Sequence, residues 1–143
     1  MRGKDKSKLV QRDNSRYPLM MTIINDYQQP PLPQIQVEDF LKIDIRIGTI
    51  IKAELFEKAK KPAFILLIDF GAGIGIKKSS AQITHHYRTE ELVGKQVAAV
   101  VNFAPRQIGN LMSEVLTLGF SDEQQQVLLF SPDKKVPNGS RLH

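Results

Sequence analysis

The sequence predicts a mostly β protein, a five-stranded barrel with one short helix between the third and fourth strands. Apolar residues alternate from Ile43 onward, which is typical of half-buried strands. A glycine, Gly48, interrupts the first alternating run, and a glycine in a strand favours a bulge that bends it. A helix-like stretch that stops at Gly94 separates three strand-like runs from the later ones.

The first half of the barrel follows from side-chain periodicity. Residues 37–43 predict a short helix or turn leading into a long strand over 43–56, in which three isoleucines share one face and Asp44 and Arg46 the other. Lys58 to Pro62 is the expected turn before a strand over 63–70. A third strand is expected over 74–83 and the helix over 89–93.

The second half adds strands over 96–103, 114–120 and 126–130, with a final turn at Pro137 to Gly139. Strands in this order, with a helix after the third, match an OB-fold barrel. An open α+β sandwich is the structural alternative. The class is therefore all-β with minor α.

Composition limits the function. The 143 residues include no cysteine, which excludes thiol catalysis, thiolate metal sites and disulfides and fits a reducing compartment. No apolar run approaches the roughly 20 residues of a membrane span. The net charge is +5, but residues 1–19 hold six basic and two acidic side chains, so four of the five charges lie there. Any affinity of the barrel for polyanions must come from a local patch. We expect a cytoplasmic protein.

The chain divides into a flexible N-terminal leader, residues 1–36, and a barrel domain, residues 37–143. The leader is charged and polar and then proline-rich, with QQPPLPQ at 28–34. Met20 and Met21 are possible alternative translation starts.

Several strands are apolar on both faces. In the strand predicted over 63–70, Ile65 and Leu67 point away from the face that is expected to line the barrel interior. In the run 97–101, Ala98 and Val100 point away from that interior face in the same way. Because one barrel cannot bury both faces, the helix and leader or a second subunit must cover them. We expect a homodimer.

Two segments gather polar groups. The run from Val100 to Gly119 breaks at a proline and concentrates hydrogen-bonding side chains at one rim of the sheet. Lys77 to Gln82 offers two cations and three neutral polar side chains, which suits phosphate and sugar contacts or a solvated hairpin face.

Other motifs are weak. GAGIG at 71–75 has the wrong spacing for a dinucleotide loop and precedes a strand, so we expect no nucleotide cofactor. His85 and His86 are adjacent and cannot share a metal ion. No serine has a nucleophile elbow. We therefore expect no metal, no cofactor and no catalytic residue.

Four blocks carry a family resemblance: DIRIGTI at 44–50, IKKSSAQIT at 76–84, VVNFAPRQIGNLMSEVLTLG at 100–119 and VPNG at 136–139. They resemble the tRNA-binding domain of the CsaA type, which is similar to a module appended to bacterial methionyl-tRNA synthetases. The likeness covers residues 37–142.

The resemblance implies an OB-fold homodimer that binds tRNA by shape and also acts as an export chaperone for unfolded preproteins. The RNA-binding residues that it indicates are Lys77, Lys78, Ser79, Ser80, Gln82, Asn102, Arg106, Ser113 and Glu114. Of these, Lys77, Lys78 and Arg106 are expected on phosphates.

The predicted function is therefore non-enzymatic binding of tRNA or structured RNA, with export chaperoning as a second activity. The alternative is a polypeptide-binding secretion chaperone with little or no RNA binding. A small-molecule enzyme has little support in the sequence.

Overall fold

The computed structural model describes residues 10–11, 22–23 and 26–143. Within the leader, β1 (Val10–Gln11) and β2 (Thr22–Ile23) pair antiparallel and η2 (Asp26–Gln28) follows. Residues 29–36 form no helix or strand and are mostly exposed. The predicted flexibility of the leader and the alternative starts at Met20 and Met21 concern mainly residues outside those described, and both stay predictions.

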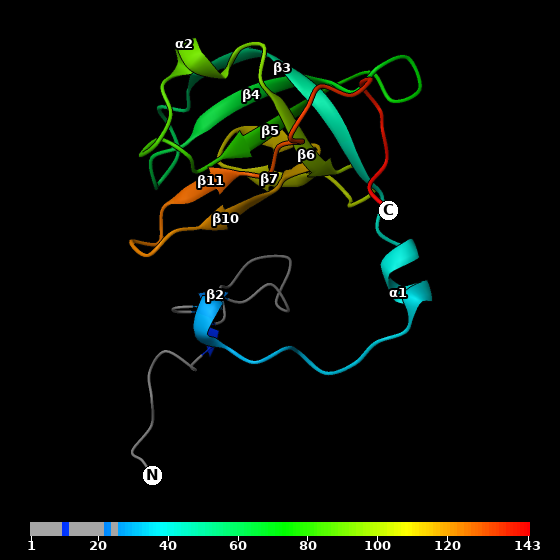
Figure 1. Ribbon diagram of the computed structural model, residues 1–143. Coiled ribbons are helices and arrows are strands. Elements are labelled where there is room, and N and C mark those ends of the chain that lie inside the picture. Colours follow the sequence, from blue (N-terminus) through cyan, green and yellow to red (C-terminus); the bar gives the residue numbers. More distant parts are fainter. Residues whose placement is uncertain (1–9, 12–21, 24–25) are drawn as a thin grey trace.

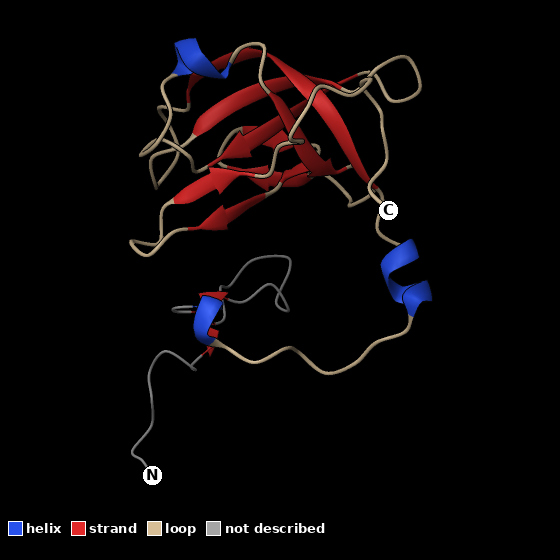
Figure 2. Cartoon of the chain, in the orientation of Figure 1, coloured by secondary structure: helices blue, strands red, loops and turns tan. Residues whose placement is uncertain are grey.

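The main body is a nearly closed antiparallel barrel (Figures 1 and 2). Its five-stranded sheet has the order β5-β4-β3-β6-β9. The short helix α2 (Thr89–Leu92) lies between the third and fourth of these strands in the chain, which confirms the predicted OB-fold order. The five strands are β3 (Ile45–Leu55), β4 (Phe64–Asp69), β5 (Ile76–Ala81), β6 (Gln96–Val100) and β9 (Leu116–Thr117).

Two hairpins extend the barrel. β7 (Arg106–Ile108) pairs with β8 (Leu111–Ser113), and β10 (Gly119–Ser121) pairs with β11 (Val127–Leu129). The strand predicted over 114–120 is thus split into β9 and β10. Leu118 lies between them and donates its N–H to Ala98 O, while its carbonyl accepts from Phe130 N. The chain changes sheets at this residue.

Gly48 is needed for packing, and the predicted bulge lies elsewhere. The register of β3 against β4 shifts between Ile50 and Lys52, whereas Gly48 pairs regularly with Val97. A Cβ at Gly48 would lie 2.5 Å from Ile68 Cγ2 and 2.8 Å from Phe70 Cδ1. Glycine therefore allows two core side chains to approach the backbone of β3.

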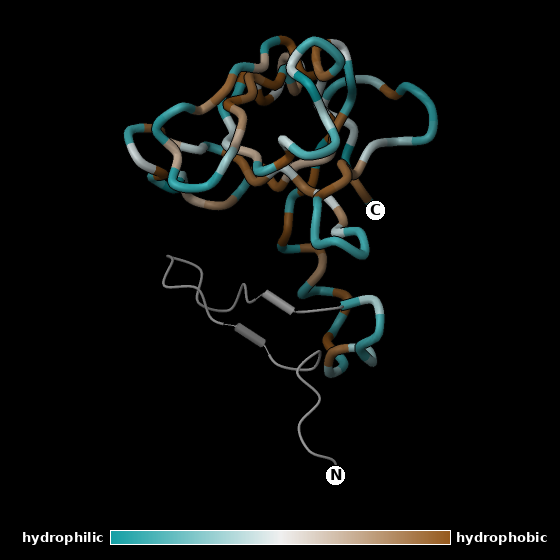
Figure 3. The backbone as a smooth tube through the Cα atoms, turned by 90° about the vertical axis from the view of Figure 1, so that its left-hand side faces the viewer, coloured by the Kyte–Doolittle hydropathy of each residue, from teal (hydrophilic) through white to brown (hydrophobic). Residues whose placement is uncertain are grey.

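The hydrophobic core fills the barrel. Its buried members come from β3, β4, β5, β6 and α2, and from three positions next to strands, Phe70, Ile83 and Val115. Figure 3 shows the hydrophobic stretches running through the barrel strands. The largest of these side chains are Phe70, Ile50, Leu66, Ile68 and Leu92.

A smaller cluster joins the turn after β3 to the β7–β8 hairpin. Phe56, Ala63 and Leu111 are buried together, with Ile65 and Ile108 packed against them. This cluster holds the hairpin against the end of the barrel.

The outer face of β6 is covered by the end of the chain itself. Ala98 and Val100 are buried, and the C-terminal segment, residues 130–142, runs beside β3 and β6. Ile47 donates its N–H to Ser140 O at 2.9 Å, and Leu142 donates to Ile45 O at 2.9 Å. The C-terminal segment therefore covers this part of the outer face without the helix or a second subunit.

Helix α1 (Val37–Leu41) has no buried residue. The Asp39 carboxylate accepts the Gln36 N–H at 3.0 Å, which caps its first turn. Figure 1 shows α1 beyond the barrel, near the C-terminus.

Candidate nucleic-acid interface

The polar residues predicted to bind RNA gather where the barrel closes. Lys77 to Ser80 lie on β5, and Gln82 directly follows it; Ser113 ends β8, and Glu114 is the next residue. Arg106 begins β7 and pairs directly with Ser113. Eight of the nine predicted residues therefore belong to one region, which we call the barrel seam, and Asn102 lies apart from it.

Hydrogen bonds of these side chains hold the barrel seam together. Glu114 donates its N–H to Lys78 O at 2.7 Å, and its carboxylate accepts the Lys78 N–H at 2.9 Å. Ser80 donates its N–H to Ser113 Oγ at 3.0 Å. The Ser79 hydroxyl is fully buried and lies 2.7 Å from that of Thr117. Ser79, Ser113 and Glu114 are thus engaged in closing the barrel.

A cavity of about 230 Å³ opens at the barrel seam. Its apolar lining includes Ile83, Val115, Leu116 and Leu129. Its polar lining comprises Ser80, Gln82, Arg106, Ser113, Glu114 and Thr117. We call it the seam cavity. A guanidinium, a carboxylate, an amide and hydroxyls around an apolar floor suit binding of a partly polar ligand.

The two predicted phosphate-binding lysines point to opposite faces of β5, because side chains alternate along a strand. Lys77 pairs with Ile68, whose side chain is in the core. The Lys77 side chain therefore points to the same inner face as that of Ile68, at the end of the barrel. Lys78 pairs with Leu67 on the outer face and is exposed. The structure therefore does not bring their ammonium groups together.

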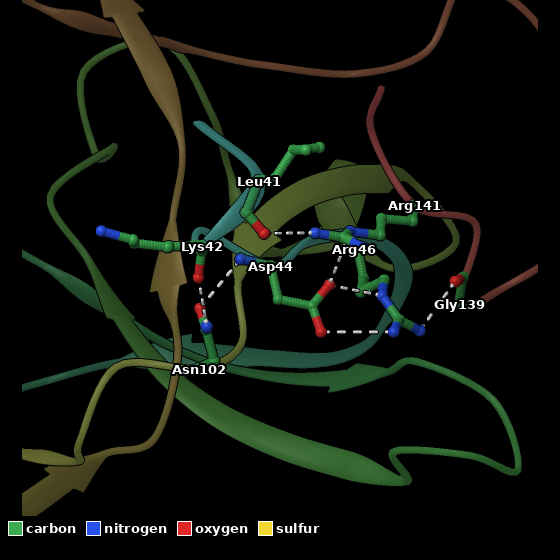
Figure 4. A network of polar contacts seen from close by, with 7 residues as sticks. All are labelled: Leu41, Lys42, Asp44, Arg46, Asn102, Gly139 and Arg141. Atoms are coloured by element: carbon green, nitrogen blue, oxygen red, sulfur yellow. Dashed lines mark hydrogen bonds and ion pairs between the residues drawn. The ribbon is translucent and has the colours of Figure 1, made fainter. Parts of the chain in front are cut away.

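Asn102 belongs to a separate polar network that fixes α1 and the C-terminus (Figure 4). Its side-chain oxygen accepts the Asp44 N–H at 2.9 Å, and its amide donates to Lys42 O at 2.8 Å. Asp44 in turn receives two hydrogen bonds from Arg46, at 2.6 and 3.2 Å. Arg141 donates to Leu41 O at 2.9 Å. The Asn102 side chain thus ties the turn after α1 to the end of β6.

Sequence reasoning missed the hairpin that carries Arg106. The polar corner contains Gly109 and Asn110 between two short apolar segments, and Gly-Asn is a two-residue hairpin signal. Gly109 has φ +58°, in the left-handed region that such a turn uses. This signal could have placed Arg106 opposite Ser113 from the sequence alone.

A second tie joins the loop after β5 to the β10–β11 hairpin. His86 Nε2 lies 2.7 Å from Asp122 Oδ2, and the backbone N–H groups of Gln124 and Gln126 donate to Asp122 Oδ1. The Gln126 bond, followed by that of His86, lowers the pKa of Asp122 from its ordinary 3.8.

Because the pKa of Asp122 is lowered in the folded state, its contribution to stability is complete above pH about 4 and is lost as the pH falls through the folded-state value. We expect Asp122→Asn to lower the urea midpoint at pH 7 and to approach the wild-type midpoint in strong acid. Urea unfolding at several pH values measures this. Glu123→Gln, an exposed neighbour, is the control. A difference in urea midpoint between Asp122→Asn and wild type that stays constant across the acid range would contradict this prediction.

Within the described residues, no group of three histidine or acidic side chains could hold a metal ion. No helix in that part of the chain is long and apolar enough to cross a lipid bilayer.

A nearly closed five-stranded barrel, with a cavity of mixed polar and apolar lining where it closes, defines an OB-like fold. Residues 45–141 match the family described as "Putative tRNA binding domain", and the chain belongs to this family. The chain is 34% identical over 119 residues to the methionine–tRNA ligase of Flavobacterium johnsoniae and 36% identical over 117 residues to that of Porphyromonas gingivalis. These alignments cover 83% and 81% of this chain but only 16% and 17% of the ligases.

Two solved structures are also similar. The chaperone CsaA of Bacillus anthracis has 47% sequence identity and a TM-score of 0.74, over 78% of this chain and 100% of that one. The CsaA chaperone protein of Picrophilus torridus has 48% identity and a TM-score of 0.72, over 77% and 100%. These similarities confirm both the predicted family and the predicted fold.

Proposed function

We propose that the chain binds tRNA or structured RNA in the cytoplasm without catalysing a reaction. The observation that carries this proposal is the family match over residues 45–141, the same stretch that builds the barrel seam and the seam cavity. The matched part of the methionine–tRNA ligases is about a sixth of their length, so their catalytic activity is not transferred to this chain.

The seam residues divide into two roles in this proposal. Lys77, Lys78, Gln82 and Arg106 have side chains long enough to reach an RNA strand, with the cations on phosphates and the amide on sugar or base. The other five residues form hydrogen bonds that shape the surface. Four of them do so through their side chains, Ser79, Ser113, Glu114 and Asn102, and Ser80 does so through its backbone N–H. Their substitution would therefore act on RNA through the shape of the site.

We further propose that the protein is a homodimer. An apolar groove of about 400 Å³ remains between the C-terminal segment and the outer face of β3 and β6. Its apolar lining comprises Ile45, Ile47, Ala98, Phe130, Pro132, Val136 and Leu142. Nearby, α1 exposes Val37 and Leu41, and the bond from Arg141 to Leu41 O links it to the groove. A second copy could cover both surfaces.

Export chaperoning of unfolded preproteins is the second candidate function. Two CsaA chaperones match this chain over their whole length at nearly half identity. The apolar floor of the seam cavity suits a side chain of an extended polypeptide. If RNA binding proves negligible, this becomes the main activity.

A titration of labelled bulk tRNA at several salt concentrations tests the proposal. The slope of log affinity against log salt is about −0.9 per phosphate contact, so changing Lys77, Lys78 and Arg106 to alanine should reduce its magnitude by about 2 to 3. The measurement is a fluorescence titration of both proteins.

The control is the chain begun at Met21, which lacks the basic residues 1–19. Binding lost in this control would indicate charge attraction by the leader. Unchanged affinity in the triple variant would move the site away from the barrel seam. No binding by the full chain would leave the polypeptide chaperone as the function.

A further inference from the structure

A third hollow lies at the start of β6, at the opposite end of the strand from Asn102. It has a volume of about 320 Å³. Lys95 and Gln96 border it on one side, Thr49 lies beside them on β3, and Asp133, Lys134 and Lys135 border it on the other side. We call it the lysine hollow. None of its lysines was among the residues predicted to bind RNA.

The backbone around the lysine hollow is fixed by hydrogen bonds. Gln96 donates its amide to Val136 O at 2.7 Å and accepts the Val136 N–H at 3.0 Å. The Thr49 hydroxyl donates to Asn138 Oδ1 at 2.7 Å. Lys95 O accepts the Ile50 N–H at 2.9 Å, next to the bulge. The backbone carrying Lys95 and that following Lys135 are therefore held in place before any ligand arrives.

The lining of the lysine hollow carries a net positive charge. Asp133 is the one carboxylate among its lining residues, against three lysines. Within the described part of the chain, none of the three forms an ion pair within 4.0 Å. Lys134 and Lys135 are exposed, and Lys95 Nζ lies 6.0 Å from the centroid of the Tyr87 ring. Two exposed lysines, and a third whose ammonium lies over the Tyr87 ring, thus border a polar surface, and such a surface suits an anion.

We propose that the lysine hollow binds phosphate groups of an RNA backbone. This inference rests on the proposed RNA-binding function and extends it to a second contact. β6 spans Gln96–Val100, so at about 3.3 Å per residue its two ends are about 13 Å apart. An RNA molecule that reaches both ends must be folded or several nucleotides long. The lining offers lysines and small polar groups and, apart from Pro132, no apolar side chain, so it favours phosphate over a base or an apolar peptide.

The position of the hollow also fits the proposed homodimer. Pro132 lines both the lysine hollow and the apolar groove. When a second copy covers the groove, the hollow borders the interface. RNA held there lies close to both protomers.

The test changes Lys95, Lys134 and Lys135 to glutamine and measures the affinity for bulk tRNA against salt concentration. We expect the magnitude of the salt slope to fall by about 2 to 3, at about 0.9 per lost contact. Changing the same lysines to arginine keeps the charge and should keep the slope. The matched control changes Lys58, Lys60 and Lys61, three lysines on the turn after β3, to glutamine and should alter the slope by less than one unit. Thermal unfolding of each variant checks that it is folded.

Each outcome separates this inference from the proposed function. Wild-type protein that binds tRNA, with an unchanged slope in the glutamine variant, overturns the lysine hollow alone. Wild-type protein that does not bind tRNA overturns both. Binding of inorganic phosphate can be monitored by amide shifts in NMR spectra. If the glutamine variant loses phosphate binding but keeps tRNA binding, the hollow holds a small anion and the proposal is wrong. Loss of binding to an acidic unfolded polypeptide with tRNA binding intact also overturns it.

Discussion

Substituting alanine for Gly48 should destabilise the barrel by about 1–3 kcal/mol, the usual cost of overpacking a core. The added Cβ would lie 2.5 Å from Ile68 Cγ2 and within 3 Å of two atoms of the Phe70 ring. Both side chains are buried, at 0% and 1% exposure, so neither can turn away into solvent. The backbone of β3 is itself held on both sides, by Val97 of β6 and by residues 139–140 of the C-terminal segment. Urea unfolding followed by circular dichroism measures the change.

Gly73→Ala is the matched control for this prediction. A Cβ at Gly73 meets no atom within 4 Å. Since replacing glycine reduces the entropy of the unfolded chain, this variant should be neutral or slightly more stable. Equal stability of the Gly48 and Gly73 variants would show that the core yields at Gly48. A larger loss for Gly48→Val than for Gly48→Ala would support the steric explanation.

The difference between Gly48 and the bulge shows what local sequence can predict about the barrel. Alternation predicted where β3, β4, β5 and β6 lie, because a buried face imposes a period of two, but it did not predict β7 and β8. The bulge at Ile51 carries no such mark, since the residue is an isoleucine within an apolar run. Likewise, the cover over Ala98 comes from residues 130–142, which are too far away in the chain for a local pattern to reveal the contact.

The candidate site was predicted only in part, because local sequence shows clusters of polar residues but not contacts between distant segments. Polar clusters in sequence located β5 and the corner correctly, and pairing then brought Arg106, Ser113 and Ser80 together. Sequence could not show that the hydroxyl of Ser79 is buried against that of Thr117, because this depends on how the barrel closes. Nor could it show that Lys95 lines the same hollow as Lys134 and Lys135, which are about 40 positions later.

Leu41→Glu should convert the proposed homodimer into a monomer. Leu41 is 55% exposed on α1, so the change does not disturb a core within one chain. Its backbone carbonyl accepts a hydrogen bond from Arg141, beside the apolar groove. Burying a carboxylate in an apolar interface without a partner is strongly unfavourable, so association should weaken by orders of magnitude. Light scattering during size-exclusion chromatography measures the mass of the protein in solution.

Leu55→Glu controls for the added charge, because Leu55 is 57% exposed at the far end of β3 from α1 and the groove. This variant should keep the wild-type mass. Linked binding sites raise the overall affinity by about 10² to 10⁴, so Leu41→Glu should also weaken tRNA binding if both protomers contact one RNA. A Leu41→Glu protein that remains a dimer would place the interface elsewhere. A monomer that binds tRNA as tightly as wild type would show that one barrel suffices, because avidity requires both sites to engage the same molecule.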